Sequence, residues 1–149
     1  MENNYIKSNQ ILTIKYKTFA KRYLSNVYRA ENDINKRYDS SRELLNYLCG
    51  KMNIPNVELV VLDKNRKKNN NKEIHGFYVK SGRKDLSKIV IYNRTAVRGN
   101  IISINQYIDT LLHEFMHHYD FNVIKLNESL HTSAFYNRIN DLKNKLWKS

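Results

Sequence analysis

The stretch TLLHEFMHHYDFN, residues 110–122, lies within the segment of the chain that has the clearest helical periodicity. Apolar side chains recur there at intervals of three and four residues, which predicts an amphipathic helix with one buried face. Ser103 and Gln106 have the spacing of a capping box, so we expect the helix to begin at this point. The rest of the fold must pack against the apolar residues of this helix, which are Ile104, Tyr107, Ile108, Leu111, Leu112, Phe115, Met116 and Tyr119.

The same stretch contains the pattern H-E-x-x-H, formed by His113, Glu114 and His117. Residues four apart lie on one helix face with their Cβ atoms about 5–6 Å apart, so both imidazoles can bind one zinc ion. Glu114 points to the side of this pair, where its carboxylate can accept a proton from a water molecule that the metal activates. Ordinary polar-face roles are disfavoured because four of the five histidines lie between positions 113 and 131. We expect His113 and His117 to be zinc ligands and Glu114 to be the general base.

A catalytic zinc ion has three protein ligands and one open position, so a third ligand is required. Asp120 is seven residues beyond His113 on the same helix, a rise of about 10 Å, and we expect it to orient a ligand histidine or to cap the helix. Glu128, in the following loop, would complete a set of two histidines and one glutamate. His131 stands at the head of the next predicted helix, which can fold back antiparallel. We assign His131 as the third ligand, with Glu128 and Asp120 as the alternatives.

Other polar residues near the motif have less specific roles. His118 is rotated about 100° from its ligand neighbour, which predicts a surface or hydrogen-bonding role, and His75 is predicted to be a structural residue of a strand. Tyr119, Tyr136 and Arg138 are candidates to stabilise an oxyanion, and the sequence does not decide among them.

The segments LLHEFMHHYDF and LHTSAFYNRI together resemble the SprT-like metallopeptidases, the group that includes the DNA–protein crosslink protease Spartan, and the wider H-E-x-x-H group with its YgjP-like proteins. In that family a histidine at the head of the next helix stands in an H-G-x-x-F context. His131 and Phe135 keep this spacing, and Thr132 occupies the glycine position. The resemblance covers residues 57–147 and implies a minimal zincin-like core that hydrolyses peptide bonds. The sequence has no cysteine-based zinc ribbon, so the resemblance extends to the peptidase core alone.

Two further helices are predicted before the core. The periodicity of residues 9–28 predicts an amphipathic helix with a basic outer side. Residues 40–55 predict a second helix, with a capping box at Ser40 and Glu43 and a stop at Gly50.

Strands are expected between these helices and the H-E-x-x-H helix. Runs rich in β-branched and aromatic residues begin at Val57, Ile74 and Lys88 and predict a three-stranded antiparallel sheet. The basic, Asn-rich segment between the first two runs, residues 64–72, is predicted to be a solvated hairpin loop rather than a phosphate contact. A final helix is expected from Thr132, and the whole order predicts an α+β fold in a single domain, residues 1–149, with an N-terminal basic helical part, residues 1–52.

The charge of the chain bears on its partners. A formal net charge of +12 and a pI near 9.8 favour anionic partners such as nucleic acid. Interleaved tyrosines and lysines at residues 14–29 could stack on bases, which keeps open the alternative of a basic DNA-binding protein with a non-catalytic zinc site. We prefer the interpretation in which these tyrosines face the core, because they coincide with the helical stripe.

The remaining expectations concern substrate and location. The resemblance implies a polypeptide substrate, which an exposed sheet edge at residues 89–92 would hold. Cys49 is the only cysteine, which excludes an internal disulfide, and it is expected to be a small buried residue. The first ten residues do not resemble a signal peptide and no segment is apolar enough to span a membrane, so we expect a cytoplasmic protein.

Overall fold

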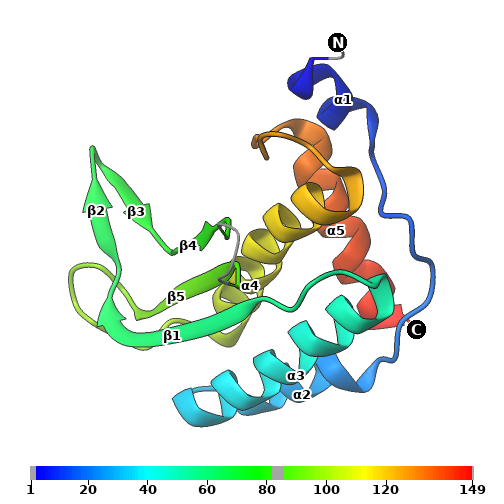
Figure 1. The fold of residues 1–149 in the computed structure, drawn as a ribbon. Helices are drawn as coiled ribbons and strands as arrows, with labels where there is room; N and C mark the ends of the chain where they lie inside the picture. Colours follow the sequence, from blue (N-terminus) through cyan, green and yellow to red (C-terminus); the bar gives the residue numbers. More distant parts are fainter. Residues whose placement is uncertain (1–2, 82–85, 149) are drawn as a thin grey trace.

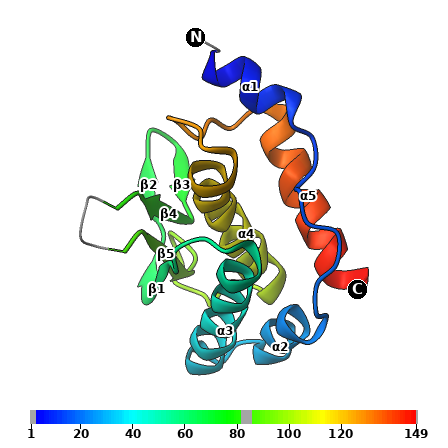
Figure 2. The same cartoon turned by 45° about the vertical axis from the view of Figure 1, so that its right-hand side comes forward.

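The computed structural model describes residues 3–81 and 86–148 and contains helices and strands in separate layers (Figures 1 and 2). This arrangement confirms the predicted α+β class. The helices are α1 (Asn4–Gln10), α2 (Arg22–Ala30), α3 (Ile34–Met52), α4 (Ile104–Tyr119) and α5 (Ser133–Lys148), and a π-helical turn, η1 (Asp120–Ile124), follows α4. The strands are β1 (Glu58–Asn65), β2 (Lys67–Asn69), β3 (Lys72–Ile74), β4 (Gly76–Val79) and β5 (Lys88–Arg94).

Helix α4, the helix of the H-E-x-x-H motif, is the centre of the molecule. It begins where predicted, because the Ser103 side chain accepts a hydrogen bond of 3.2 Å from the Gln106 amide. Strands β4 and β5 lie on one side of α4, and α2 and α5 pack on the other side (Figure 2). Its apolar residues, including Leu111, Leu112 and Phe115, are fully buried. The predicted stripe therefore forms the middle of the hydrophobic core.

The main sheet has the strand order β1-β5-β4 and differs from the predicted antiparallel sheet. β4 pairs antiparallel with β5, but β1 pairs parallel with β5. The chain leaves β1 through the β2–β3 hairpin and β4 before β5 returns between them, so β5 runs in the same direction as β1. The expectation that residues 89–92 form a free edge is wrong, because β5 is the central strand and most of its residues are buried. The free edge on the side of α4 belongs to β4.

The basic segment after β1 forms the small antiparallel hairpin of β2 and β3, with mostly exposed side chains. Asn70 and Asn71 connect the strands with φ of 50° and 66°. Positive φ at both central residues is typical of the two-residue type I′ turn, and asparagine tolerates it. The segment is thus a hairpin in contact with solvent, as predicted, and it has short strands of its own.

The single helix predicted for residues 9–28 is wrong. Helix α1 ends at Gln10, α2 begins at Arg22, and the residues between them follow an irregular path beside α5 (Figure 2). Side chains from elsewhere in the chain bind the backbone of this segment: the amides of Ile14 and Lys15 donate to Asp141 and to the Tyr119 hydroxyl, at 2.9 and 3.0 Å. Most of the predicted apolar stripe is still buried, since Phe19, Leu24 and Val27 belong to the hydrophobic core and Tyr16 and Tyr23 pack against it, but Leu12 is 55% exposed.

Helix α3 is longer than predicted. It begins at Ile34, and the N-cap is Asp33, whose carboxylate accepts from the Lys36 amide. The predicted capping box at Ser40 is wrong, because the Ser40 hydroxyl lies inside the helix and donates to the Lys36 carbonyl. The helix continues through Gly50 and ends with Asn53 in the left-handed conformation, at φ 54°. Cys49 is buried on this helix, as expected. Within the described residues, no helix has the length and apolarity needed to cross a membrane.

Two glycines provide a test of how closely β4 approaches the core. A Cβ atom at Gly76 would collide with the Val90 carbonyl oxygen of β5 and lie 3.1 Å from the Thr110 methyl group of α4. Gly76→Ala should therefore lower the free energy of unfolding by about 1–3 kcal/mol through overpacking. Gly50→Ala, on a helix face where nothing lies within 4 Å, should instead raise it by about 0.5–1 kcal/mol. Urea denaturation of both variants measures these changes. An equal change in the free energy of unfolding for the two variants would show that β4 is not closely packed against β5 and α4.

Candidate metal centre

Three histidine side chains meet beside α4. His113 and His117 lie one turn apart on this helix, and His131 precedes α5. The Nε2 atom of His131 lies 3.1 Å from the Nε2 atoms of both other histidines, and the possible ligand atoms of all three lie within 4.8 Å of one another. Zn–N bonds of about 2.0–2.1 Å at tetrahedral angles place two nitrogens about 3.3 Å apart. The three imidazoles thus have the spacing that one divalent ion requires.

The imidazoles rest on an apolar support. Phe135, fully buried on α5, stacks on His117 with 4.8 Å between ring centroids and meets His113 edge-on at 5.1 Å. Burial, together with the neighbouring imidazoles, lowers the pKa of His113 to about 4 and that of His117 to about 3. Both rings are therefore neutral near pH 7, the form in which histidine binds a metal.

Glu114 lies beside the histidines and is largely buried, with 6% of its surface exposed. Burial raises the pKa of this carboxyl to about 7. A carboxyl group that is half protonated near neutral pH can both accept and return a proton, as a general base and acid must.

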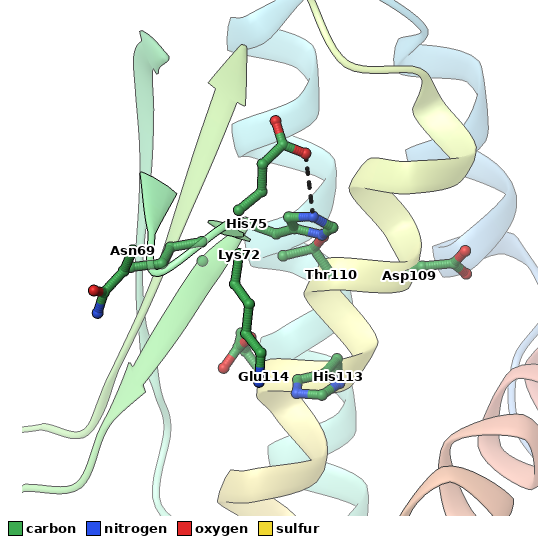
Figure 3. A pocket seen from close by; sticks show the side chains of 10 residues that line it. Asn69, Lys72, His75, Asp109, Thr110, His113 and Glu114 are labelled. Carbon is green, nitrogen blue, oxygen red and sulfur yellow. Dashed lines mark ion pairs between the residues drawn. The ribbon is translucent and has the colours of Figure 1, made fainter. Parts of the chain in front are cut away.

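Glu114 and His113 line two adjoining cavities between α4 and the edge of the sheet. The larger, of about 460 Å³, is bordered by the β2–β3 hairpin, and Figure 3 shows Asn69 and Lys72 on the hairpin side with Thr110, His113 and Glu114 on the α4 side. The second, of about 400 Å³, is bordered by β4 and by all three histidines. The histidines and Glu114 are therefore open to a ligand that lies along β4.

The prediction that His75 is a structural residue within a strand is wrong. His75 lies between β3 and β4 rather than within a strand, and half of its side chain is exposed in the wall of the larger cavity, 3.8 Å from the Glu73 carboxylate. Its position in the cavity that Glu114 also lines could not be read from the sequence, because the β2–β3 hairpin brings it there.

His118 has the predicted hydrogen-bonding role, although it is buried and not at the surface. Its Nε2 donates to the Pro55 carbonyl at 2.7 Å, since a carbonyl oxygen can only accept. Nδ1 of the neutral ring must then accept, and its donors are the Tyr78 hydroxyl at 2.8 Å and the Asn122 amide at 3.2 Å. Both nitrogens are thus occupied, so His118 cannot be a metal ligand.

The alternatives for the third ligand lie outside the cluster. Among the described residues, the group of ligand atoms comprises the three histidines alone, and Glu128 is exposed to solvent. Asp120 is fully buried and forms a 3.0 Å ion pair with Arg138. Burial raises the pKa of Asp120 and the guanidinium opposes this effect; the pair is ionised because a buried guanidinium without a counter-charge would be far more costly. Ser129 donates to this carboxylate at 2.7 Å.

One of the three oxyanion candidates lies at the cluster. Tyr119 is fully buried, and its hydroxyl accepts from the Lys15 amide, while Arg138 is buried against Asp120. Tyr136 is 46% exposed, with its ring centroid 5.9 Å from that of His113 and 6.0 Å from that of His131.

No protein-family model, curated protein or solved structure matches the chain. The resemblance to the SprT-like metallopeptidases therefore stays a prediction.

The contact between the edge strand and α4 can be tested at Tyr78. Tyr78→Phe removes the hydroxyl that donates to His118 while it keeps the ring, so the free energy of unfolding should fall by about 0.5–1.5 kcal/mol. Tyr5→Phe, at an exposed position of α1, should leave it unchanged and serves as the control in the same denaturation experiment. Identical stability of the two variants would mean that this hydrogen bond does not tie β4 to α4.

Proposed function

We propose that this protein is a zinc-dependent peptidase in which His113, His117 and His131 bind the ion and Glu114 is the general base. The observation that carries the proposal is the meeting of three imidazoles next to a buried carboxyl group on a shared cavity wall, with Nε2 of His131 3.1 Å from Nε2 of both His113 and His117. Three imidazoles with an open side match the ligand set of a catalytic zinc, whereas a structural zinc site is closed by a fourth protein ligand.

The proposed chemistry divides between the metal and the chain. Bound zinc would supply a Lewis acid that polarises a carbonyl group and lowers the pKa of a water molecule to about 7. Glu114 is one residue from His113 and faces the same cavities, so it is placed to take up the proton of that water and to return it to the leaving amine. Tyr136, at the rim of the cluster, is placed to donate a hydrogen bond to the oxyanion.

The proposed substrate is an extended polypeptide bound along β4. Among the described residues β4 is an edge strand that pairs only with β5, and its residues Gly76, Phe77 and Tyr78 line the same cavity as the histidines. Backbone groups at the free edge of a strand can pair with an added strand. The scissile bond of such a peptide would pass in front of the three imidazoles.

The charge of the protein supports a second element of the proposal, namely that substrates include proteins bound to nucleic acid. Lys67, Lys68 and Lys72 are exposed on the β2–β3 hairpin, and Lys72 also lines the larger cavity. With a net charge of +12, the chain favours anionic partners. The alternative, a basic DNA-binding protein with a non-catalytic zinc site, depends on the same net charge and on the tyrosines and lysines of residues 14–29. A cytoplasmic location stays a prediction.

The proposed ligand set predicts how zinc affinity responds to two substitutions. His131→Ala should weaken zinc binding by more than about 100-fold, beyond the about 10–100-fold effect typical of residues that merely orient a ligand. Glu128→Gln, three residues away and outside the cluster, should leave the affinity unchanged. Competition with a chromogenic chelator measures both constants. Loss of zinc from the Glu128 variant and its retention in the His131 variant would reverse the assignment.

The proposed base predicts a separation of metal binding from hydrolysis. Glu114→Gln should keep the wild-type zinc content, because the residue is not a ligand, and should lower the rate of casein cleavage by about 10²–10⁴-fold. The control variant Glu128→Gln should cleave casein at the wild-type rate. A chelator should abolish cleavage by the wild type and by this control. Undiminished turnover by the Glu114 variant would remove the base, and salt-sensitive DNA binding without cleavage by the zinc-loaded wild type would support the alternative function.

A further inference from the structure

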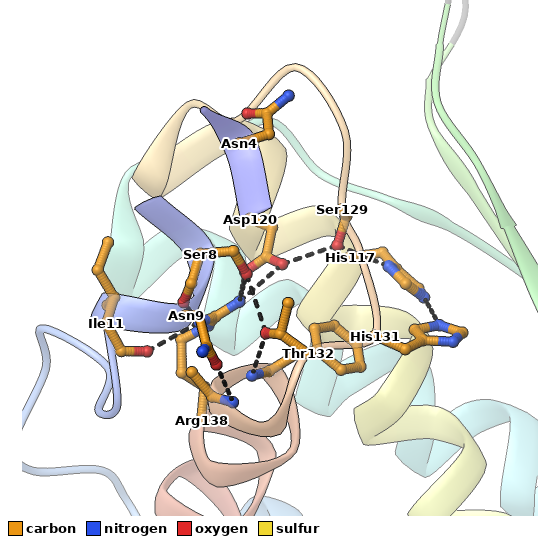
Figure 4. A network of polar contacts seen from close by, with 12 residues as sticks. Asn4, Ser8, Asn9, Ile11, His117, Asp120, Ser129, His131, Thr132 and Arg138 are labelled. Carbon is orange, nitrogen blue, oxygen red and sulfur yellow. Dashed lines mark hydrogen bonds and ion pairs between the residues drawn. The ribbon is translucent and has the colours of Figure 1, made fainter. Parts of the chain in front are cut away.

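A chain of hydrogen bonds leads away from the metal cluster through the outer nitrogen of His117 (Figure 4). Nδ1 of His117 lies 2.7 Å from the Ser129 hydroxyl oxygen, and that hydroxyl donates to the Asp120 carboxylate at 2.7 Å. A hydroxyl group has one proton to donate. Because Ser129 gives this proton to Asp120, its oxygen can only accept from His117. The neutral imidazole therefore carries its proton on Nδ1, which leaves the lone pair of Nε2 facing the other two histidines.

The direction of this chain depends on the charge of Asp120. Both carboxylate oxygens accept from one guanidinium nitrogen of Arg138 at 3.0 Å, and both side chains are 0% exposed. An ionised carboxylate is only an acceptor, so it requires the Ser129 hydroxyl to be the donor. Arg138 keeps this carboxylate ionised. It thereby sets the direction of the two hydrogen bonds that follow, from Ser129 to Asp120 and from His117 to Ser129.

The N-terminal segment holds Arg138 in place. The guanidinium donates to the carbonyls of Ser8 and Ile11, at 2.8 Å each, and to the Ser8 hydroxyl at 3.2 Å. The Ser8 hydroxyl also lies 3.2 Å from that of Thr132, the residue next to His131. Figure 4 shows α1 on the outer side of these residues, so Asp120 and Arg138 are closed off from solvent by a segment far away in sequence.

We propose that Ser129, Asp120 and Arg138 form a positioning relay that fixes His117 in the Nδ1–H tautomer and so presents its Nε2 lone pair to the metal. The relay deepens the proposed function and rests on it only for the identity of the ligand bound at Nε2. None of the three residues reaches the zinc position, so none of them is a catalytic residue.

The tautomer can be measured in the zinc-free protein. Long-range ¹H–¹⁵N NMR correlations should show His117 of the wild type with its proton on Nδ1. Ser129→Ala removes the acceptor and should give a mixture of tautomers, whereas Ser129→Thr keeps a hydroxyl and should restore the wild-type spectrum. Asp120→Asn should reverse the relay, because the introduced amide can donate to Ser129, whose proton then turns toward His117 and moves the imidazole proton to Nε2.

Zinc affinity provides the second readout. Ser129→Ala and Asp120→Asn should weaken zinc binding by about 10–100-fold, and Ser129→Thr should not. Ser133→Ala, at an exposed position outside the relay, should leave both the tautomer and the affinity unchanged. Ser129→Ala keeps the buried ion pair, so it tests the relay even if Asp120→Asn does not fold.

Two results would overturn the relay: an Nε2–H tautomer in the wild type, or a Ser129→Ala variant with the tautomer and zinc affinity of the wild type. A wild-type protein whose tautomer depends on Ser129 but which binds no zinc would support the relay and contradict the proposed function. The two proposals therefore fail in distinguishable ways.

Discussion

The buried ion pair between Asp120 and Arg138 is the interaction on which the arrangement of the site depends. Asp120 follows α4 directly, at the start of the π-helical turn, and Arg138 lies on α5, so the pair joins the helix that carries His113 and His117 to the helix that follows His131. Removing one partner of such a pair costs about 3–5 kcal/mol, because the other charge stays buried. Each side chain has further partners: Ser129 donates to the carboxylate, and two carbonyls at the end of α1 accept from the guanidinium. The buried ion pair thus lies at the place where the loop before α5 brings His131 back to His113 and His117.

The local features of α4 were predictable from sequence, whereas the start and end of α3 and the long-range pairing of the strands were not. The start of α4 at Ser103 and its buried stripe follow from hydrogen bonds and periodicity within a few residues. The direction of β1 relative to β5 does not, because an apolar run has the same pattern in a parallel and an antiparallel pair. The irregular path of residues 11–20 was hidden for a similar reason. Its apolar spacing is helical, but its amides bind Asp141, Tyr119 and Tyr47, which are distant in sequence.

The candidate site shows the same division. His113 and His117 share a face because of helix geometry, and the assignment of His131 needed only a short loop and an antiparallel return. The cavity wall formed by β4, the place of His75 and the role of Ser129 required the folded chain. Ser129 is a small polar residue in a polar loop, and nothing in its sequence context distinguishes it from Ser133. Asp120 was expected to orient a ligand histidine, and the structure places it one hydroxyl group away from His117.

A crystal structure of the zinc-soaked protein, with the ion located by its anomalous scattering, would show whether the three histidines bind zinc. We expect one strong peak about 2.0–2.1 Å from the Nε2 atoms of His113, His117 and His131, with a solvent molecule in the fourth position on the side of Glu114. A peak bound by fewer than three of these imidazoles, or closed by a fourth protein side chain, would contradict the proposed catalytic zinc site.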